Sequence, residues 1–140
     1  WYATGPGNGI QLRSGPNAGR LVIPCDHIEA TTKHYYSHVI ASDDHGLTWR
    51  LLGSTPSHQL NECAIAELDD GSLLLNMRNY DRSKRARALS RSTDAGETWG
   101  TVRRDPALPE PICQASMVAI DEGRTLVFTN PASETGRVGM

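Results

Sequence analysis

The feature that most constrains the fold of this chain is an eight-residue pattern that occurs twice. Residues 42–49 and residues 92–99 share five positions, written S-x-D-x-G-x-T-W, at a spacing of 50 residues. A pattern that returns at such a period is the sequence signature of a fold built from repeated units, such as a propeller. We therefore interpret the chain as a series of similar structural units.

Each copy of the pattern has the chemistry of a hairpin turn. The carboxylates of Asp44 and Asp94 can accept backbone N–H bonds across the turn, and glycine supplies the left-handed residue that the turn needs. Each tryptophan can cover the turn with a large apolar face. We assign a structural rather than a catalytic role to the shared residues, which are Ser42, Asp44, Gly46, Trp49, Ser92, Asp94, Gly96 and Trp99.

Short strand-like runs surround both copies in the same order. Strands are predicted around the first copy at 9–12, 20–24, 35–41 and 50–52, around the second at 62–68, 73–78, 86–91 and 102–103, and in a third unit at 115–120 and 125–130. Four strands in about 50 residues match one blade of a β-propeller, and no segment shows sustained helical periodicity. The predicted fold class is therefore all-β, with residues 1–140 forming about two and a half to three blades of one partial propeller domain. Because propellers close with roughly four to eight blades, we expect a fragment of a longer protein.

Composition removes several classes of function. The formal net charge of −2 provides no electrostatic footprint for nucleic acid, and no apolar run reaches the length of a membrane span. Cys25, Cys63 and Cys113 form no C-x-x-C pair, and the histidines show no metal-ligand spacing. The basic stretch 82–91 lacks the interleaved aromatic residues of a nucleic-acid platform, so we expect a solvated turn and strand there.

A predicted β-hairpin over residues 62–78 carries a charged residue at each end. Asp70-Gly71 indicates a two-residue turn, because glycine accepts the positive φ of a primed turn. Glu62 lies eight residues before Asp70 and Arg78 lies seven after Gly71, so both fall at the open end of the hairpin. On this pattern alone, the two charges are either a salt bridge between strand ends or half of a binding site.

The repeat is the Asp box of sialidases (neuraminidases) and related β-propellers, and much of the remaining chain resembles bacterial and lysosomal-type exo-α-sialidases. The resemblance runs nearly end to end and in the same order. Its segments are 4–12 with 19–24, before the first box; 61–63 with 70–79, the central glutamate and arginine segment; and 129–132, which leads to Arg137.

The resemblance implies a six-bladed propeller enzyme that removes terminal sialic acid with retention, through a tyrosine nucleophile, a glutamate base, an aspartate acid/base and an arginine triad. Sialidases depart from the two-carboxylate mechanism of other glycosidases. A carboxylate at the anomeric carbon repels an anionic nucleophile, and a tyrosine paired with glutamate attacks as a locally neutral pair. By resemblance, Glu62 is the base to the tyrosine, and Arg78 and Arg137 bind the sugar carboxylate through charge-assisted hydrogen bonds. The implied partners are sialylated glycoproteins, glycolipids and oligosaccharides, and no cofactor is implied.

Other parts of the family's site have no counterpart in this sequence. The Arg-Ile-Pro motif of the first triad arginine and the acid/base aspartate are absent, and no tyrosine matches the nucleophile among Tyr2, Tyr35, Tyr36 and Tyr80. We therefore expect the isolated chain to be inactive, and its parent to be secreted, periplasmic or lysosomal by family resemblance. Two alternatives stay open: a non-catalytic Asp-box propeller that binds glycans or a protein partner, and a truncated product without function.

Overall fold

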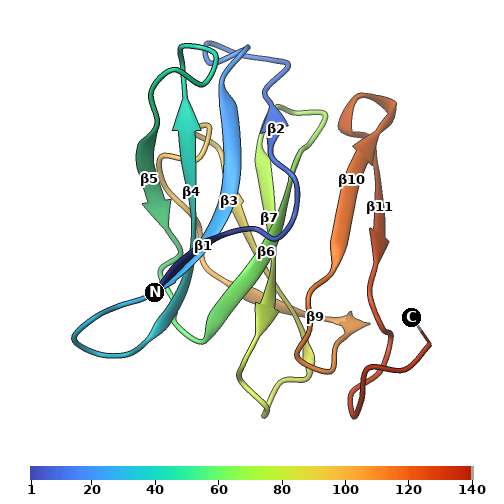
Figure 1. The fold of residues 1–140 in the computed structure, drawn as a ribbon. Coiled ribbons are helices and arrows are strands. Elements are labelled where there is room, and N and C mark those ends of the chain that lie inside the picture. The colour runs from blue at the N-terminus through green and yellow to red at the C-terminus, as the bar shows by residue number, and fades with distance from the viewer. Residues whose placement is uncertain (140) are drawn as a thin grey trace.

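The computed structural model describes residues 1–139 as three antiparallel sheets that follow one another along the chain (Figure 1). Blade 1 contains β1 (Tyr2–Thr4), β2 (Ile10–Gln11), β3 (Leu21–Ile28), β4 (Tyr35–Ser42) and β5 (Arg50–Ser54). Blade 2 contains β6 (Leu60–Glu67), β7 (Leu73–Asn79), β8 (Ala86–Ser92) and β9 (Arg103–Pro109). The third sheet is a hairpin of β10 (Ser116–Ile120) and β11 (Thr125–Thr129), with the 3-10 turn η1 (Asp121–Gly123) between its strands.

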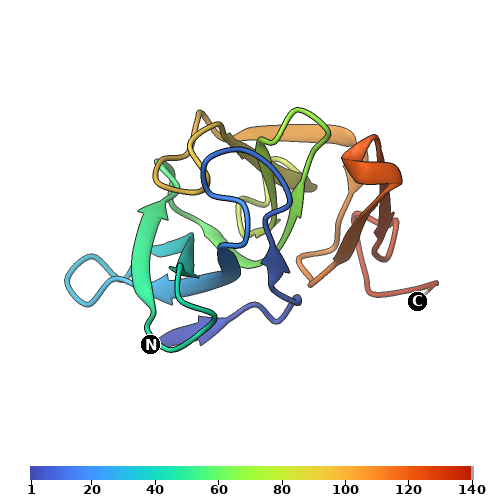
Figure 2. The ribbon, with the colours of Figure 1, turned by 90° about the horizontal axis from the view of Figure 1, so that it is seen from above.

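Apart from β1 and β2, which both pair with β3, strands that are neighbours in sequence are neighbours in each sheet, which is the meander of a propeller blade. Seen from above, the sheets lie beside one another in chain order, with the third sheet at one side (Figure 2). The predicted all-β architecture of about two and a half to three blades is confirmed: two meander sheets are followed by a two-stranded hairpin. In the part of the chain that the structure describes, no helix has the length and apolar character needed to cross a bilayer.

Three details of the strands differ from the sequence prediction. The first strand of blade 1 is divided, because β1 and β2 both pair with β3, and β1 was not predicted. The last strand of blade 2, β9, runs to Pro109 rather than ending at Arg103. A three-residue strand such as β1 contains too little alternation for its period to be read from sequence.

The turn between β6 and β7 is also longer than the predicted two residues. The N–H of Gly71 donates to the carbonyl of Leu68 at 3.0 Å, and the N–H of Leu68 donates to the carbonyl of Ser72 at 2.8 Å. Gly71 has φ +79°, so a turn over Leu68–Gly71 ends in a left-handed glycine. This is the three-residue hairpin loop with a glycine bulge.

The two copies of the repeat form the same hydrogen-bonded turn. In the first, the Ser42 hydroxyl donates to Asp44 Oδ1 at 2.7 Å and accepts the N–H of Gly46 at 2.8 Å. Asp44 Oδ1 also accepts the N–H of Thr48 at 2.8 Å. The corresponding bonds of the second copy measure 2.7, 2.9 and 2.9 Å. These side chains satisfy backbone groups that the tight turn leaves unpaired.

The main hydrophobic core lies where blade 1 faces blade 2. Inward-facing residues of alternating strand positions fill it, including Val22, Val39, Ala41, Ile65, Leu73, Leu75 and Met77. A smaller core of Ala64, Ala66 and Met117 joins blade 2 to the third sheet. Blade 2 is therefore covered on both faces, and this double burial holds the hairpin of β6 and β7 in place.

Charged residues bind the two blades together at the end of the sheets that carries the repeats. Arg20 is almost fully buried and donates to Asp43 at 2.7 Å and to Glu97 at 3.0 Å. Arg50, on β5, donates to the same Glu97 carboxylate at 2.6 Å. Glu97 belongs to the second repeat, so this network links that turn directly to blade 1.

Candidate active site

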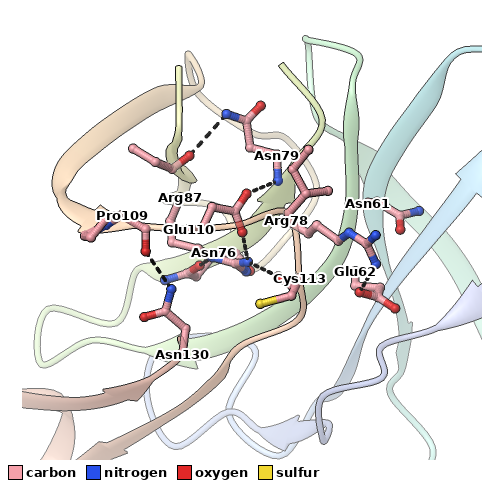
Figure 3. A network of polar contacts seen from close by, with 12 residues as sticks. Asn61, Glu62, Asn76, Arg78, Asn79, Arg87, Pro109, Glu110, Cys113 and Asn130 are labelled. Atoms are coloured by element: carbon pink, nitrogen blue, oxygen red, sulfur yellow. Dashed lines mark hydrogen bonds and ion pairs between the residues drawn. The ribbon is translucent and has the colours of Figure 1, made fainter. Parts of the chain in front are cut away.

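Glu62 and Arg78 meet at the open end of the hairpin formed by β6 and β7. Cys63 on β6 pairs with Met77 on β7, and both side chains are buried in the core. Glu62 precedes Cys63 and Arg78 follows Met77, so their side chains point to the other face of the sheet. Arg78 Nη1 donates to Glu62 Oε2 at 2.7 Å, as Figure 3 shows. The side chains are 16% and 27% exposed for Arg78 and Glu62, so both remain accessible from solvent.

Arg78 is held in place while one of its donors stays unused. Its guanidinium carbon lies 4.9 Å from the centroid of the Tyr80 ring, a cation–π contact. Burial disfavours its charged form, but the hydrogen bond and charge of Glu62 outweigh burial and raise the pKa of Arg78. Within residues 1–139, its buried Nε has no hydrogen-bond partner. The remaining surface of the guanidinium is reached by solvent, and a second carboxylate can bind there beside Glu62.

A second carboxyl group, Asp26, lies beside this ion pair. It is fully buried on β3, and its Oδ2 accepts a hydrogen bond from Asn61, the residue before Glu62. Burial, reinforced by the charge of Glu62 and opposed by that of Arg78, raises the pKa of Asp26 to about 7. Sequence reasoning did not assign Asp26 to the site. The only sequence signal was an acidic residue at the end of an apolar run.

A buried ion pair supports the site from behind. Arg87 Nη1 donates to Glu110 Oε2 at 2.6 Å, with both side chains at most 1% exposed. Arg87 Nε donates to Asn76 on β7, and Glu110 Oε1 accepts the N–H of Asn79, the residue after Arg78 (Figure 3). Breaking such a pair leaves an uncompensated buried charge, at a cost of about 3–5 kcal/mol.

The position of Arg87 corrects one expectation. The stretch 82–91 was expected to be solvated, but Arg87 has no exposed surface; residues 82–85 at the turn and Arg91 near the end of β8 are exposed. Burial lowers the pKa of Arg87 and raises that of Glu110, and each shift is opposed by the charge of the partner. No pattern in the sequence indicated that Glu110 would be its partner, because the two residues lie on separate elements.

Arg137 bonds a different part of the chain from the pair of Glu62 and Arg78. Its Nη2 donates to the carbonyl of Ile112 at 3.2 Å, and the side chain is exposed. Within residues 1–139, no hydrogen bond or ion pair joins Arg137 to Glu62 or Arg78. Both arginines nevertheless act on the Cys113 thiol, where burial raises the pKa and the guanidinium charges oppose that rise.

No metal centre is formed by the residues that the structure describes. His27 and His38 approach each other, with their Nδ1 atoms 3.0 Å apart. In residues 1–139, no group of three or more histidine, cysteine, aspartate or glutamate side chains gathers where a metal ion could bind. Two imidazoles alone do not complete the coordination that protein zinc sites require.

Comparisons with known proteins place this geometry in context. The BNR repeat-like domain family matches residues 1–140. A sialidase of Micromonospora viridifaciens is 39% identical over 139 residues, which cover 94% of this chain and 21% of that protein. A sialidase of Bacteroides fragilis is 32% identical over 98% of this chain and 25% of its own length.

Solved structures agree with the sequence relatives. A Hadza microbial sialidase superposes with a TM-score of 0.78 at 31% identity, over 96% of this chain and 26% of that one. A leech intramolecular trans-sialidase superposes with a TM-score of 0.74 at 27% identity, over 97% of this chain and 20% of that one. The chain thus spans about a fifth to a quarter of the length of these proteins. It belongs to the BNR repeat-like domain family and is part of an Asp-box β-propeller of the sialidase family.

Proposed function

We propose that the protein carrying this chain is an exo-α-sialidase that hydrolyses terminal sialic acid from glycoconjugates, with residues 1–140 as part of its propeller domain. The observation that carries the proposal is the 2.7 Å contact between Glu62 and Arg78 in a chain whose relatives are sialidases. Pairs of strand-end charges are common in sheets, whereas this pair is partly buried and still reached by solvent.

Arg78 has the properties of a carboxylate ligand. Its guanidinium is fixed by Glu62 on one side and by the Tyr80 ring on the other, so little side-chain freedom is lost when an anion binds. The part of the guanidinium that solvent reaches is available to a second carboxylate, such as the one that sialic acid carries. Arg137 supplies another cation from the segment after β11, and we assign it to the same carboxylate.

Glu62 has the properties of a base whose orientation is fixed. Arg78 bonds one carboxylate oxygen, Oε2, and the side chain keeps 27% of its surface exposed toward an incoming group. In the proposed reaction, a tyrosine from the parent protein transfers its hydroxyl proton to Glu62 as its oxygen attacks the anomeric carbon. The glycosidic bond breaks at the same time, and the aglycone oxygen leaves with a proton from the acid/base aspartate of the parent protein. Because Glu62 takes the proton only during attack, the tyrosine itself stays neutral until then, close to the carboxylate of the substrate.

The test is hydrolysis of a sialoside by the protein that carries this chain. Arg78→Ala should lower kcat/KM by roughly 10²-fold or more, because each charge-assisted hydrogen bond is worth about 1.5–3 kcal/mol. Glu62→Gln should lower kcat more than it raises KM, because it acts in the chemical step. Arg103→Ala removes an exposed arginine from β9 and serves as the matched control.

Hydrolysis that is unimpaired in folded Arg78→Ala would contradict the assignment. Far-ultraviolet circular dichroism and thermal unfolding of each variant establish that the fold is intact. Binding of a sialylated glycan without any hydrolysis by the wild-type protein would instead favour a non-catalytic glycan-binding propeller.

A further inference from the structure

The carboxyl group of Asp26 has no role in the proposed reaction, yet it is buried beside the residues that perform it. Its Oδ2 accepts a hydrogen bond from Asn61, and its Oδ1 has no partner in residues 1–139. We propose that Asp26 is a positioning residue whose charge sets the upper pH limit at which Arg78 accepts a carboxylate. The inference deepens the proposed function and rests on Arg78 as the ligand of the substrate carboxylate.

A continuous set of contacts connects Asp26 to that guanidinium. The Asn61 side chain donates to Asp26 with its amide nitrogen and accepts the Tyr80 hydroxyl with its oxygen at 3.3 Å. The ring of Tyr80 in turn lies against the Arg78 guanidinium. Three strands, β3, β6 and β7, therefore place one buried carboxyl group behind one partly exposed cation.

The charges around Asp26 determine which way its ionisation acts. Glu62 on β6 raises its pKa and Arg78 on β7 lowers it, with burial as the largest cause of the net rise to about 7. The remaining titratable groups near it are the Tyr80 hydroxyl and the thiols of Cys25 and Cys63, whose pKa values are all raised, chiefly by burial. Arg78 is therefore the cation near Asp26: it bonds Glu62 directly, and its charge also favours the ionised form of Asp26.

The consequence follows from this balance of charges. Below pH 7 Asp26 is neutral, and Arg78 faces the single negative charge of Glu62. Above pH 7 the ionised Asp26 adds a second negative charge, which weakens attraction between Arg78 and a third carboxylate from the substrate. By linkage, a bound anion must also raise the proton affinity of Asp26, so binding near pH 7 takes up protons.

The substitution Asp26→Asn isolates the charge from the shape. An asparagine keeps the size of the side chain and an oxygen that accepts from Asn61, but it stays neutral at every pH. Asp69→Asn removes the same charge from the exposed turn at the opposite end of the hairpin, and is the matched control. The probe is N-acetylneuraminic acid, titrated calorimetrically into the protein that carries this chain.

The dissociation constant of the wild-type protein should rise by roughly 3- to 10-fold between pH 6 and pH 8.5, which corresponds to up to one pKa unit of coupling. Asp26→Asn should bind with constant affinity across this range, and Asp69→Asn should follow the wild type. Titrations at pH 7 in buffers of different ionisation enthalpy should reveal proton uptake in the wild type and none in Asp26→Asn.

Each outcome separates the inference from the proposed function. A constant wild-type affinity, or an Asp26→Asn variant with the wild-type pH profile, overturns the inference even if sialosides are hydrolysed. The expected pH profile without hydrolysis leaves the inference standing and removes the proposed function, whereas no binding of the sugar acid removes both. If Asp26→Asn fails to fold, carbon-13 NMR of the wild-type Asp26 carboxyl decides: titration near pH 4 overturns the inference.

Discussion

The two Asp boxes have the same hydrogen bonds inside the turn but different neighbours outside it. In the first box, the carbonyl of Gly46 accepts the indole N–H of Trp49 at 3.1 Å, and Trp49 is 41% exposed. In the second box, the carbonyl of Gly96 accepts the N–H of Gly53 from blade 1 at 3.1 Å, and Trp99 is 8% exposed. The glycine carbonyl of the second box therefore accepts from β5 of blade 1, whereas the corresponding carbonyl of the first box accepts from its own tryptophan.

This difference separates local from tertiary stabilisation. The bonds among serine, aspartate, glycine and threonine depend only on residues within the box, so they form equally in both copies. Burial of the tryptophan depends on the sheet alongside. Blade 1 provides that cover for the second box, and in residues 1–139 no sheet does so for the first.

The largest expected effect is on the tryptophans. Trp99→Ala should lower the free energy of unfolding by about 3–5 kcal/mol, as for other buried aromatic side chains, because it leaves a cavity in the core. In a chain of residues 1–140, Trp49→Ala should cost less than half as much, because the ring is partly solvated there. Urea unfolding of both variants measures the difference in unfolding free energy. Equal losses would show that the neighbouring sheet does not stabilise Trp99 more than Trp49.

The glycines should show a smaller difference in the same direction. Gly46 and Gly96 have φ of +89° and +91°, so alanine strains both by about 1–3 kcal/mol. A Cβ at Gly96 would also lie 3.1 Å from Val39, whereas at Gly46 nothing lies closer than 3.7 Å. Gly96→Ala should therefore destabilise by an additional ~1–3 kcal/mol from overpacking. Thermal unfolding of the pair tests this, and an equal cost would show that Val39 moves aside freely.

The smallest difference is expected for the box aspartates. Hydrogen bonds from Thr48 and Ser42 hold the pKa of Asp44 down to about 2, and bonds from Thr98 and Ser92 lower the pKa of Asp94 against partial desolvation. A lowered pKa stabilises the fold above about pH 4, and this stability is lost as pH falls toward 2. Asp44→Ala and Asp94→Ala should therefore weaken the acid dependence of Tm by similar amounts. A clearly steeper effect at one site would show that the turns are not equivalent.

The turns and strands were predictable because their causes are local. The boxes contain the hydrogen-bonding side chains of the turn in sequence, and the alternation of β6 and β7 is long enough to read. Counting residues away from the turn predicted that Glu62 and Arg78 lie at the same open end of the hairpin. The three-residue loop at Gly71 then places them on the same face, because a two-residue turn would shift the register by one residue.

The residues that escaped prediction owe their roles to other strands. Asp26 follows an apolar run on β3, and only the packing of β6 against β3 shows that it is buried near Glu62. In the sequence, Arg87 is one of several cations in a basic stretch. In the structure it donates to Glu110, which lies in the segment after β9. Such pairings join segments that are distant in the sequence, and a single sequence does not show which distant segments are close in space.

The glutamate that joins the two blades sits at a variable position of the box. Glu97 fills the place between glycine and threonine, where the first box has Leu47, a residue 85% exposed. The five shared positions build an interchangeable turn, whereas this sixth one reads the arginines of the adjoining blade. Glu97 thus links the second box to blade 1 through a position that the two boxes do not share. Grafting the second box onto another blade would preserve its turn but remove the bonds of Glu97 to Arg20 and Arg50.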